Sequence, residues 1–187
     1  TTPVDGVFTF SNVTLYEGTL VKFKYTVDET DVDQKFIIPS SNADTSTLKV
    51  IVQNSASDTS SNTYTLSSGF SGVGSDSKVY FIQESTDGKF EVYFGDGVTG
   101  KKLENGNVVI LEYIVTNKTS SNGAKTFALQ GSVGGFTNVS ITTNSVSQGG
   151  ADGEDNESVK FNAPLNFAAQ DRAVTTTDYE TLVKGIY

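Results

Sequence analysis

The stretch Leu20-Val-Lys-Phe-Lys-Tyr-Thr-Val-Asp28 alternates strictly between apolar and polar side chains. Successive side chains of a β-strand point to opposite faces, so a period of two indicates a strand with one buried face. The predicted buried face carries Val21, Phe23, Tyr25 and Val27, and the predicted solvent face carries Lys22, Lys24, Thr26 and Asp28. We therefore read this stretch as a half-buried strand and apply the same test along the chain.

Two longer stretches follow the same rule. Residues 89–94 place Phe90, Val92 and Phe94 on one face, and residues 108–115 place Val109, Leu111, Tyr113 and Val115 together. Shorter alternating runs occupy residues 7–10, 36–38, 48–52, 64–66, 79–82 and 139–143. Turn-rich segments separate these runs and no helical pattern intervenes, which favours antiparallel pairing over parallel strands joined by helices.

Two Gly-containing pairs predict turns. Asp87-Gly88 lies between the predicted strands 79–85 and 90–94, and Asn105-Gly106 opens the strand that begins at Val108. Asp-Gly and Asn-Gly are the favoured central pairs of type I′ turns. The first part of the chain is therefore expected to be built from hairpins.

The pattern changes after Gly149. A flexible acidic connector is expected first, and then a short helix over residues 156–162 that Pro164 ends. Thr177 and Glu180 form a capping box, which predicts the start of a last helix.

The predicted fold is mainly β, of the α+β class. An antiparallel β-rich scaffold domain is expected over residues 1–150, with 25–116 as a candidate central subdomain. A short helical C-terminal segment over 151–187 is expected to begin a further domain.

Composition excludes several functions. The chain has 187 residues, a net charge of −9 and a pI of about 4.4, so its overall field does not attract nucleic acid or an anionic membrane. It contains no His and no Cys, which removes Ser-His-Asp and Cys-His mechanisms and thiolate metal sites. It also contains no Met, which indicates a processed chain or a piece of a longer one.

Residues 95–102, with the sequence GDGVTGKK, nearly match a nucleotide-binding P-loop. Gly95, Gly100 and Lys101 fit the pattern, but Lys102 stands where Ser or Thr must hold Mg²⁺. A P-loop also opens a helix, and turn and strand residues follow here. These two failures favour a structural turn.

In that structural turn, Gly95, Gly97 and Gly100 are expected to adopt positive φ. Asp96 is expected to accept hydrogen bonds from backbone N–H groups inside the turn.

Two acidic clusters are weak candidates for chemistry. Asp28, Glu29, Asp31 and Asp33 lie in a polar run, which is typical of a solvated loop rather than of a catalytic pair. Residues 152–157 lack the spacing of a calcium loop and are expected to cap the following helix. We expect no catalysis, cofactor, metal or small-molecule substrate.

Several segments together, in this order along the chain, resemble a known family. They are Ile38-Pro-Ser-Ser-Asn-Ala-Asp-Thr-Ser-Thr-Leu-Lys-Val50, Lys78-Val-Tyr-Phe81, Tyr93-Phe-Gly-Asp-Gly97, Gly106-Asn107, Asn162-Ala-Pro164, Gln170-Asp-Arg-Ala-Val-Thr175 and Asp178-Tyr179. They resemble the baseplate J-like proteins, and within them the baseplate wedge subunits of contractile-tailed, T-even-like bacteriophages and cyanophages.

This resemblance implies a structural protein without catalytic activity, located in the tail baseplate of the virion and assembled in the host cytoplasm. It implies self-association as a homodimer, binding to other wedge proteins, and a part in the ring whose rearrangement triggers sheath contraction. Family chains are longer at both ends, so a fragment is expected. The structural or interface candidates are Asp96, Gly97, Pro164, Arg172, Asp178 and Tyr179. Arg172 is expected to pair with an acidic group such as Asp178.

Two other classes remain open. A β-sandwich adhesin or carbohydrate-binding module of a tail or cell surface would present Tyr16, Tyr64, Tyr80 and Tyr93 on a shallow face, whereas ordinary strand tyrosines would be half-buried. A hydrolase using carboxylates alone would need two close carboxylates in a pocket, and no spacing points to one.

Overall fold

A computed structural model describes residues 7–31, 34–85 and 87–169, and beyond these 172, 174–176, 179, 180 and 183. Contacts within the chain divide it into two compact units, Thr1–Gln148 and Gly149–Tyr187. Whether each unit folds as an independent domain, and whether 25–116 is a subdomain, stays a prediction.

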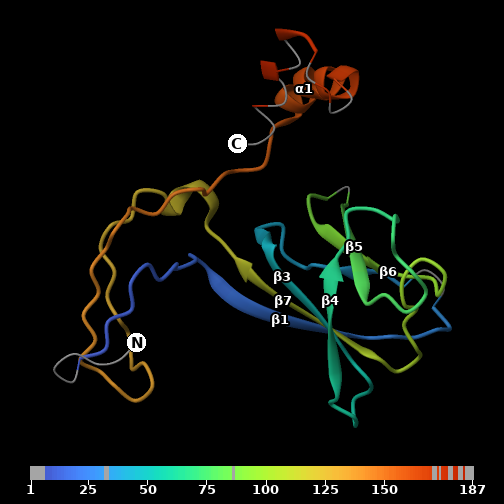
Figure 1. Ribbon diagram of the computed structural model, residues 1–187, viewed down its shortest axis with the longest axis horizontal. Helices are drawn as coiled ribbons and strands as arrows, with labels where there is room; N and C mark the ends of the chain where they lie inside the picture. The colour runs from blue at the N-terminus through green and yellow to red at the C-terminus, as the bar shows by residue number, and fades with distance from the viewer. Residues whose placement is uncertain are drawn as a thin grey trace. The chain divides into compact units, whose positions relative to one another are not determined.

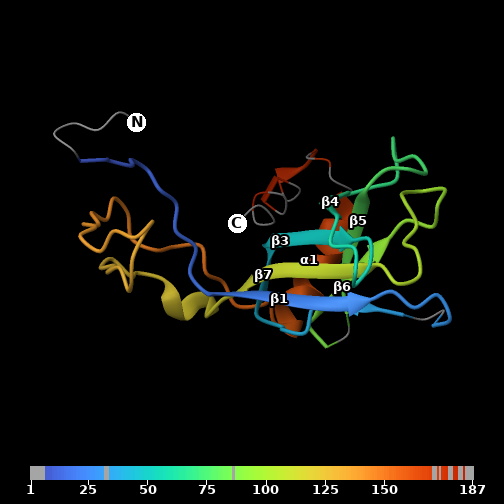
Figure 2. The same cartoon turned by 90° about the horizontal axis from the view of Figure 1, so that it is seen from below.

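The first unit is built on one seven-stranded sheet (Figures 1 and 2). Its strands are β1 (Thr19–Thr26), β2 (Phe36–Ile37), β3 (Ala43–Gln53), β4 (Ser61–Leu66), β5 (Val79–Glu84), β6 (Phe90–Phe94) and β7 (Val108–Val115). Their order across the sheet is β1-β7-β3-β4-β5-β6-β2. The prediction of a mainly β fold with a short C-terminal helical segment is confirmed.

Pairing within the sheet is antiparallel except at one place. β4 and β5 run parallel, through the pairs Thr65–Val79 and Leu66–Tyr80. The expectation of antiparallel pairing is therefore wrong for these two strands. Residues 67–78 connect them without a helix, and β5 begins beside the last two residues of β4.

The core lies on one face of the sheet, as the alternation predicts. Val109, Leu111 and Tyr113 of β7 and Val92 of β6 are buried, while Val21 and Tyr25 of β1 pack against them. Phe23 departs from the prediction because 38% of its surface stays exposed. It belongs to an edge strand, which has a neighbour on only one side.

The two edge strands of the sheet contact each other. The Tyr25 hydroxyl of β1 donates a 2.7 Å hydrogen bond to the Ile37 carbonyl of β2, and the Tyr25 and Phe36 rings meet edge to face. Phe36 packs in the same way on Phe94, which packs on Tyr64. The sheet is thus curled around a row of aromatic rings that joins both edges to the core.

A bulge in β3 lies inside the segment Asp44-Thr-Ser-Thr47. The pairing of β3 with β7 shifts register between Asp44 and Lys49. The Asp44 carboxylate accepts hydrogen bonds from the N–H and the hydroxyl of Ser46, and the Thr47 hydroxyl accepts the N–H of Ile114 at 3.0 Å. The side chain of Thr47 thus replaces the backbone acceptor that the bulge removes.

Both predicted type I′ turns have another geometry. In the β5–β6 hairpin, Ser85 N–H bonds to the Lys89 carbonyl and Gly88 N–H to the Ser85 carbonyl, so the loop holds three residues and ends in Gly88 at φ +70°. In the turn closed by Asn107 N–H and the Glu104 carbonyl, Gly106 has φ +83° and Asn105 does not have positive φ, which is a type II turn.

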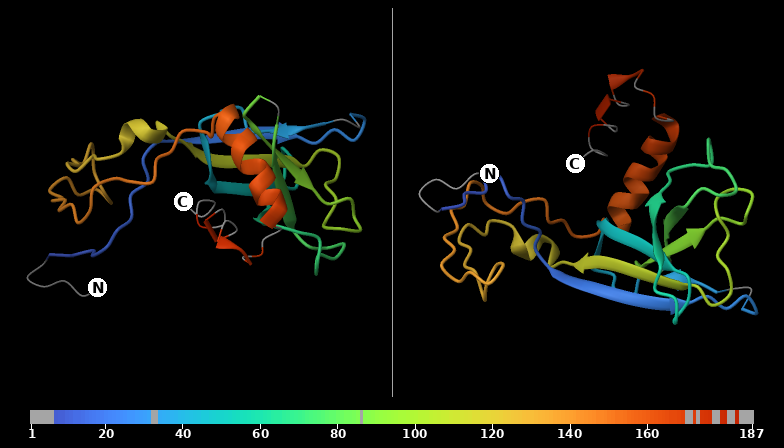
Figure 3. Two further views of the ribbon diagram at one scale, coloured as in Figure 1. Left: turned by 90° about the horizontal axis from the view of Figure 1, so that it is seen from above. Right: turned by 60° about the horizontal axis from the view of Figure 1, so that its bottom comes forward.

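The second unit contains α1 (Asn156–Ala169), drawn in orange in Figure 3. Asp155 caps it by accepting the Ser158 N–H on its carboxylate at 2.8 Å, which confirms the predicted acidic lead-in. The prediction that Pro164 ends this helix is wrong, since the helix continues to Ala169. Proline costs one backbone hydrogen bond inside a helix but does not forbid the helical φ. Among the described residues, no helix is both long and apolar enough to cross a membrane.

Two predicted strands do not form. Residues 7–10 and 139–143 belong to no strand, although their side chains alternate. Residues 117–148 contain only the short 3₁₀ helix η1 (Lys118–Ser121) and an isolated bridge between Val133 and Phe136. An alternating sequence becomes a strand only where another strand pairs with it, and no strand among the described residues pairs with these segments.

Candidate functional site

The glycine-rich loop after β6 is a closed structural turn. The Asp96 carboxylate accepts the backbone N–H groups of Val98 and Thr99 at 2.9 and 2.8 Å, and Gly97 N–H donates to the Gly100 carbonyl at 3.0 Å. Gly97 and Gly100 have φ of +92° and +93°, as predicted. These observations confirm the expected role of Asp96.

The prediction that residue 95 must be glycine in order to adopt positive φ is wrong. Gly95 does not have positive φ, but a side chain there would overlap the backbone of Gly100. Gly100 N–H in turn donates to the Gly74 carbonyl, and Lys101 N–H to the Ser77 carbonyl at 2.8 Å. Glycine is needed at 95 because two backbone segments touch, which no local pattern reveals.

This loop cannot cradle a phosphate in the manner of a P-loop. The N–H groups of Val98 and Thr99 already bind the Asp96 carboxylate, and that negative charge would repel a phosphate. Leu103 follows as a buried residue and the chain then enters a turn and β7, so no helix begins there. The structural interpretation of GDGVTGKK is consistent with all of these contacts.

The backbone hydrogen bonds from Thr99 and then Val98 hold the pKa of the Asp96 carboxyl below its ordinary value of 3.8. A carboxyl whose pKa is lower in the folded than in the unfolded protein stabilises the fold at pH values above the unfolded-state pKa. This contribution disappears as the pH falls through the folded-state pKa. Asparagine would keep an acceptor oxygen but lose the charge. We expect Asp96→Asn to be less stable than the wild type near neutral pH, by a difference in unfolding free energy that shrinks as the pH falls below 3.8.

Urea unfolding of the wild type and of Asp96→Asn at neutral pH and at a series of lower pH values tests this prediction. The other carboxyls titrate in both proteins, so their effects cancel in the difference. A difference in unfolding free energy that stays constant with pH would show that the Asp96 charge is not its cause.

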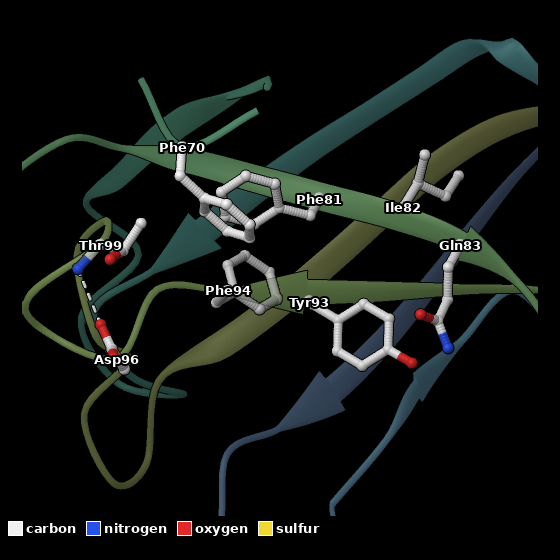
Figure 4. A pocket seen from close by; sticks show the side chains of 8 residues that line it. All are labelled: Phe70, Phe81, Ile82, Gln83, Tyr93, Phe94, Asp96 and Thr99. Atoms are coloured by element: carbon white, nitrogen blue, oxygen red, sulfur yellow. Dashed lines mark hydrogen bonds between the residues drawn. The ribbon is translucent and has the colours of Figure 1, made fainter. Parts of the chain in front are cut away.

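An aromatic pocket lies beside this loop, on strands β5 and β6 (Figure 4). Its volume is about 610 Å³ and it is open to solvent. It is lined by Phe70, Phe81, Ile82, Gln83, Tyr93, Phe94, Asp96 and Thr99. Phe70 packs on Phe81 with 5.0 Å between ring centroids, and the Tyr93 hydroxyl points toward Gln83. An open pocket with four aromatic rings suits an apolar side chain of a partner protein.

Glu91 is a buried acid that sequence reasoning missed. It lies on β6 and is 3% exposed, with Lys35 Nζ at 3.5 Å from its carboxylate. Burial first, and then the neighbouring Glu91, raises the pKa of the Tyr93 hydroxyl. The alternation of residues 90–94 placed Glu91 on the solvent face, and no local signal could have shown that this position is covered.

The acidic run before β2 is a solvated loop, as predicted. Asp28, Glu29 and Asp31 are exposed, and Asp28 binds the Thr30 N–H and hydroxyl at 2.9 and 2.6 Å. These bonds from Thr30 lower the pKa of Asp28, which is opposite to the shift of a general acid. Asp33 lies outside the described residues. Within the described part of the chain, no group of three or more acidic residues could hold a metal ion.

The structure tests few of the C-terminal candidates. Pro164, Arg172 and Tyr179 are exposed, and Tyr179 N–H donates to the Thr175 carbonyl at 3.2 Å. Asp178 lies outside the described residues, as does Thr177 of the expected capping box. The pairing of Arg172 with Asp178 stays a prediction.

The tyrosines proposed for a glycan-binding face do not share one. Tyr64 and Tyr80 are 5% and 4% exposed and belong to the core. Tyr16 is exposed on the segment before β1, and Tyr93 lines the aromatic pocket. The arrangement required by the adhesin interpretation is therefore absent for these four side chains.

Comparison with known proteins places the sheet in a family. Residues 21–127 match the model of a family described as bacteriophage baseplate wedge protein gp6, third domain, and this range runs from β1 past β7. Baseplate wedge protein gp6 of Enterobacteria phage T4 is 31% identical over 133 aligned positions, which cover 59% of this chain and 20% of the relative. The aligned part thus spans about a fifth of that relative's length.

Proposed function

The chain belongs to the family of bacteriophage baseplate wedge protein gp6, and on that premise we propose that it is a structural component of a phage tail baseplate. The observation that carries the proposal is the family match over residues 21–127, which contains nearly all of the seven-stranded sheet. A sheet closed by an aromatic row between its two edges is a rigid support for protein contacts.

In this proposal, the chain associates with a second copy of itself and with other wedge proteins to form the baseplate ring. The ring holds the contractile sheath extended and helps to transmit the trigger for contraction. Assembly takes place in the host cytoplasm, and the mature protein is in the virion. The aromatic pocket between Phe70 and Tyr93 supports this role, because an exposed ring cluster is a common anchor for a partner side chain.

The proposal includes no catalytic step. The chain has no His or Cys. The side chain of Asp96 is engaged by the turn that it closes, and its pKa is lowered. A general acid would instead need a carboxyl with a raised pKa inside a pocket.

Immunogold labelling of intact virions tests the proposed location. We expect antibodies raised against this chain to bind purified particles at the end of the tail away from the head, and the chain to be found among virion proteins by mass spectrometry. Antibodies depleted on the purified chain are the control. Label on the capsid or along the whole tail, or absence of the chain from washed virions, would contradict the proposal.

A further inference from the structure

The aromatic pocket on β5 and β6 has two chemically different parts. Its apolar part consists of the rings of Phe70, Phe81, Tyr93 and Phe94. The Asp96 carboxylate lies at one end of these rings, beside Thr99 (Figure 4). Among the described residues that line the pocket, none is basic. The pocket therefore combines aromatic ring faces with a negative charge that no described lining residue neutralises.

The Asp96 carboxylate has one oxygen to offer to a ligand. The backbone N–H groups of Val98 and Thr99 both donate to Oδ1, at 2.9 and 2.8 Å, which leaves Oδ2 to accept a bond from outside the turn. Because these bonds hold the pKa of Asp96 below its ordinary value of 3.8, the group is ionised at neutral pH. The turn also fixes its position, and a group fixed in advance loses little entropy when it binds.

The rings of the pocket are held in place by the sheet. Phe94 packs edge to face on the buried Tyr64, with 5.5 Å between ring centroids, and this contact joins the pocket to the core. Phe81 of β5 pairs with Tyr93 of β6. Phe70 packs on Phe81 and is 70% exposed, so its ring is a rim of the pocket that a ligand can still cover.

This combination of groups favours a cationic side chain, and arginine above lysine. The face of an aromatic ring is negative, and a guanidinium stacks on it more often than an ammonium does. The apolar stem of arginine can lie along the rings while its planar head bonds to a carboxylate. An apolar side chain would cover the rings but gain nothing from Asp96, and an acidic one would be repelled. The net charge of −9 attracts a basic partner in the same sense.

We propose that this pocket binds an arginine side chain of a partner protein, with the Phe70 and Phe81 rings as its stacking surface and the Asp96 carboxylate as its counter-ion. The inference rests on the partner binding included in the proposed function and adds the chemistry of one contact. It also gives a role to Phe70, whose exposed ring contributes little to the core.

A titration followed by the backbone amide signals in NMR spectra tests the proposal on the unmodified chain. The probe is N-acetyl-arginine amide, and the control is N-acetyl-citrulline amide, which has nearly the same shape without the charge. We expect the arginine probe to shift the signals of residues 81–83 and 93–99 to saturation. The citrulline probe should bind roughly fivefold more weakly or less, because it lacks the ion pair and the cation–π contact.

Two variants with matched controls locate the binding. Phe70→Leu removes the exposed ring, and Phe10→Leu removes a ring that is 71% exposed in the segment before β1. Asp96→Asn removes the counter-ion, and Asp58→Asn removes the same charge from the loop between β3 and β4. We expect Phe70→Leu and Asp96→Asn each to weaken arginine binding roughly fivefold, and both controls to bind as the wild type does.

Several outcomes would overturn the proposal. Equal binding of the two probes would show that charge does not select the ligand. Shifts of similar size around Asp28 and Asp58 that do not saturate would show general attraction of a cation to an acidic protein. Should Asp96→Asn not fold, the comparison of probes and Phe70→Leu still decides. Absence of binding would remove the arginine contact, whereas the baseplate location would still be decided by immunogold labelling.

Discussion

Replacing Leu111 by alanine should lower the free energy of unfolding by about 3 kcal/mol. Leu111 is fully buried in β7, where it pairs with Phe23 of β1 on one side and Val50 of β3 on the other. The substitution removes buried methyl groups and leaves a cavity that strands fixed on both sides cannot close. Urea unfolding should report this loss, and the melting temperature should fall by roughly 10 °C.

Leu20→Ala is the matched control for this prediction. Leu20 lies on β1 with 57% of its surface exposed, so we expect a change within about 0.5 kcal/mol. If both leucine substitutions cost the same, β7 would not be the centre of the core. If neither has an effect, the sheet would not unfold as one cooperative unit.

Replacing Gly95 by alanine should destabilise the protein by about 3 kcal/mol. A Cβ atom at residue 95 would lie 2.5 Å from Gly100 Cα and closer still to the Gly100 carbonyl group. Backbone atoms cannot move aside as a flexible side chain would, because the N–H groups of Gly100 and Lys101 are hydrogen-bonded to the carbonyls of Gly74 and Ser77. The loop must therefore open and lose those bonds. Thermal or urea unfolding measures the cost.

Gly69→Ala is the control, because residue 69 lacks positive φ and has nothing within 4 Å of the added Cβ. We expect it to change stability by less than about 0.5 kcal/mol. A tolerated Gly95→Ala would mean that the two backbone segments are not in contact in solution. In that case the bonds from Gly100 and Lys101 to residues 74–77 would also be in doubt.

Most strands were predictable because alternation is a local property. β1, β6 and β7 follow the alternation of their own residues, and the faces predicted for Val109, Leu111 and Tyr113 are the buried ones. The Asp96 turn was predictable for a similar reason, since a short acid can bond to N–H groups two and three residues ahead.

Partners distant in sequence were not predictable from local pattern. The parallel pairing of β4 with β5 depends on where residues 67–78 return the chain. The burial of Glu91 depends on what covers β6, and the need for glycine at 95 depends on the approach of Gly100. Local spacing carries no information about such encounters.

The amino-acid sequence by itself determined that this chain forms a mainly β protein without histidine or cysteine chemistry, and that it resembles a baseplate family. Periodicity and turn residues are read from a few neighbouring positions, and composition is a count over the chain, so none of them needs the tertiary structure. Only the tertiary structure decided which alternating segments become strands. Residues 108–115 lie between two neighbouring strands, whereas no strand in the described part of the chain pairs with residues 7–10 or 139–143, and a strand needs a partner for its peptide groups.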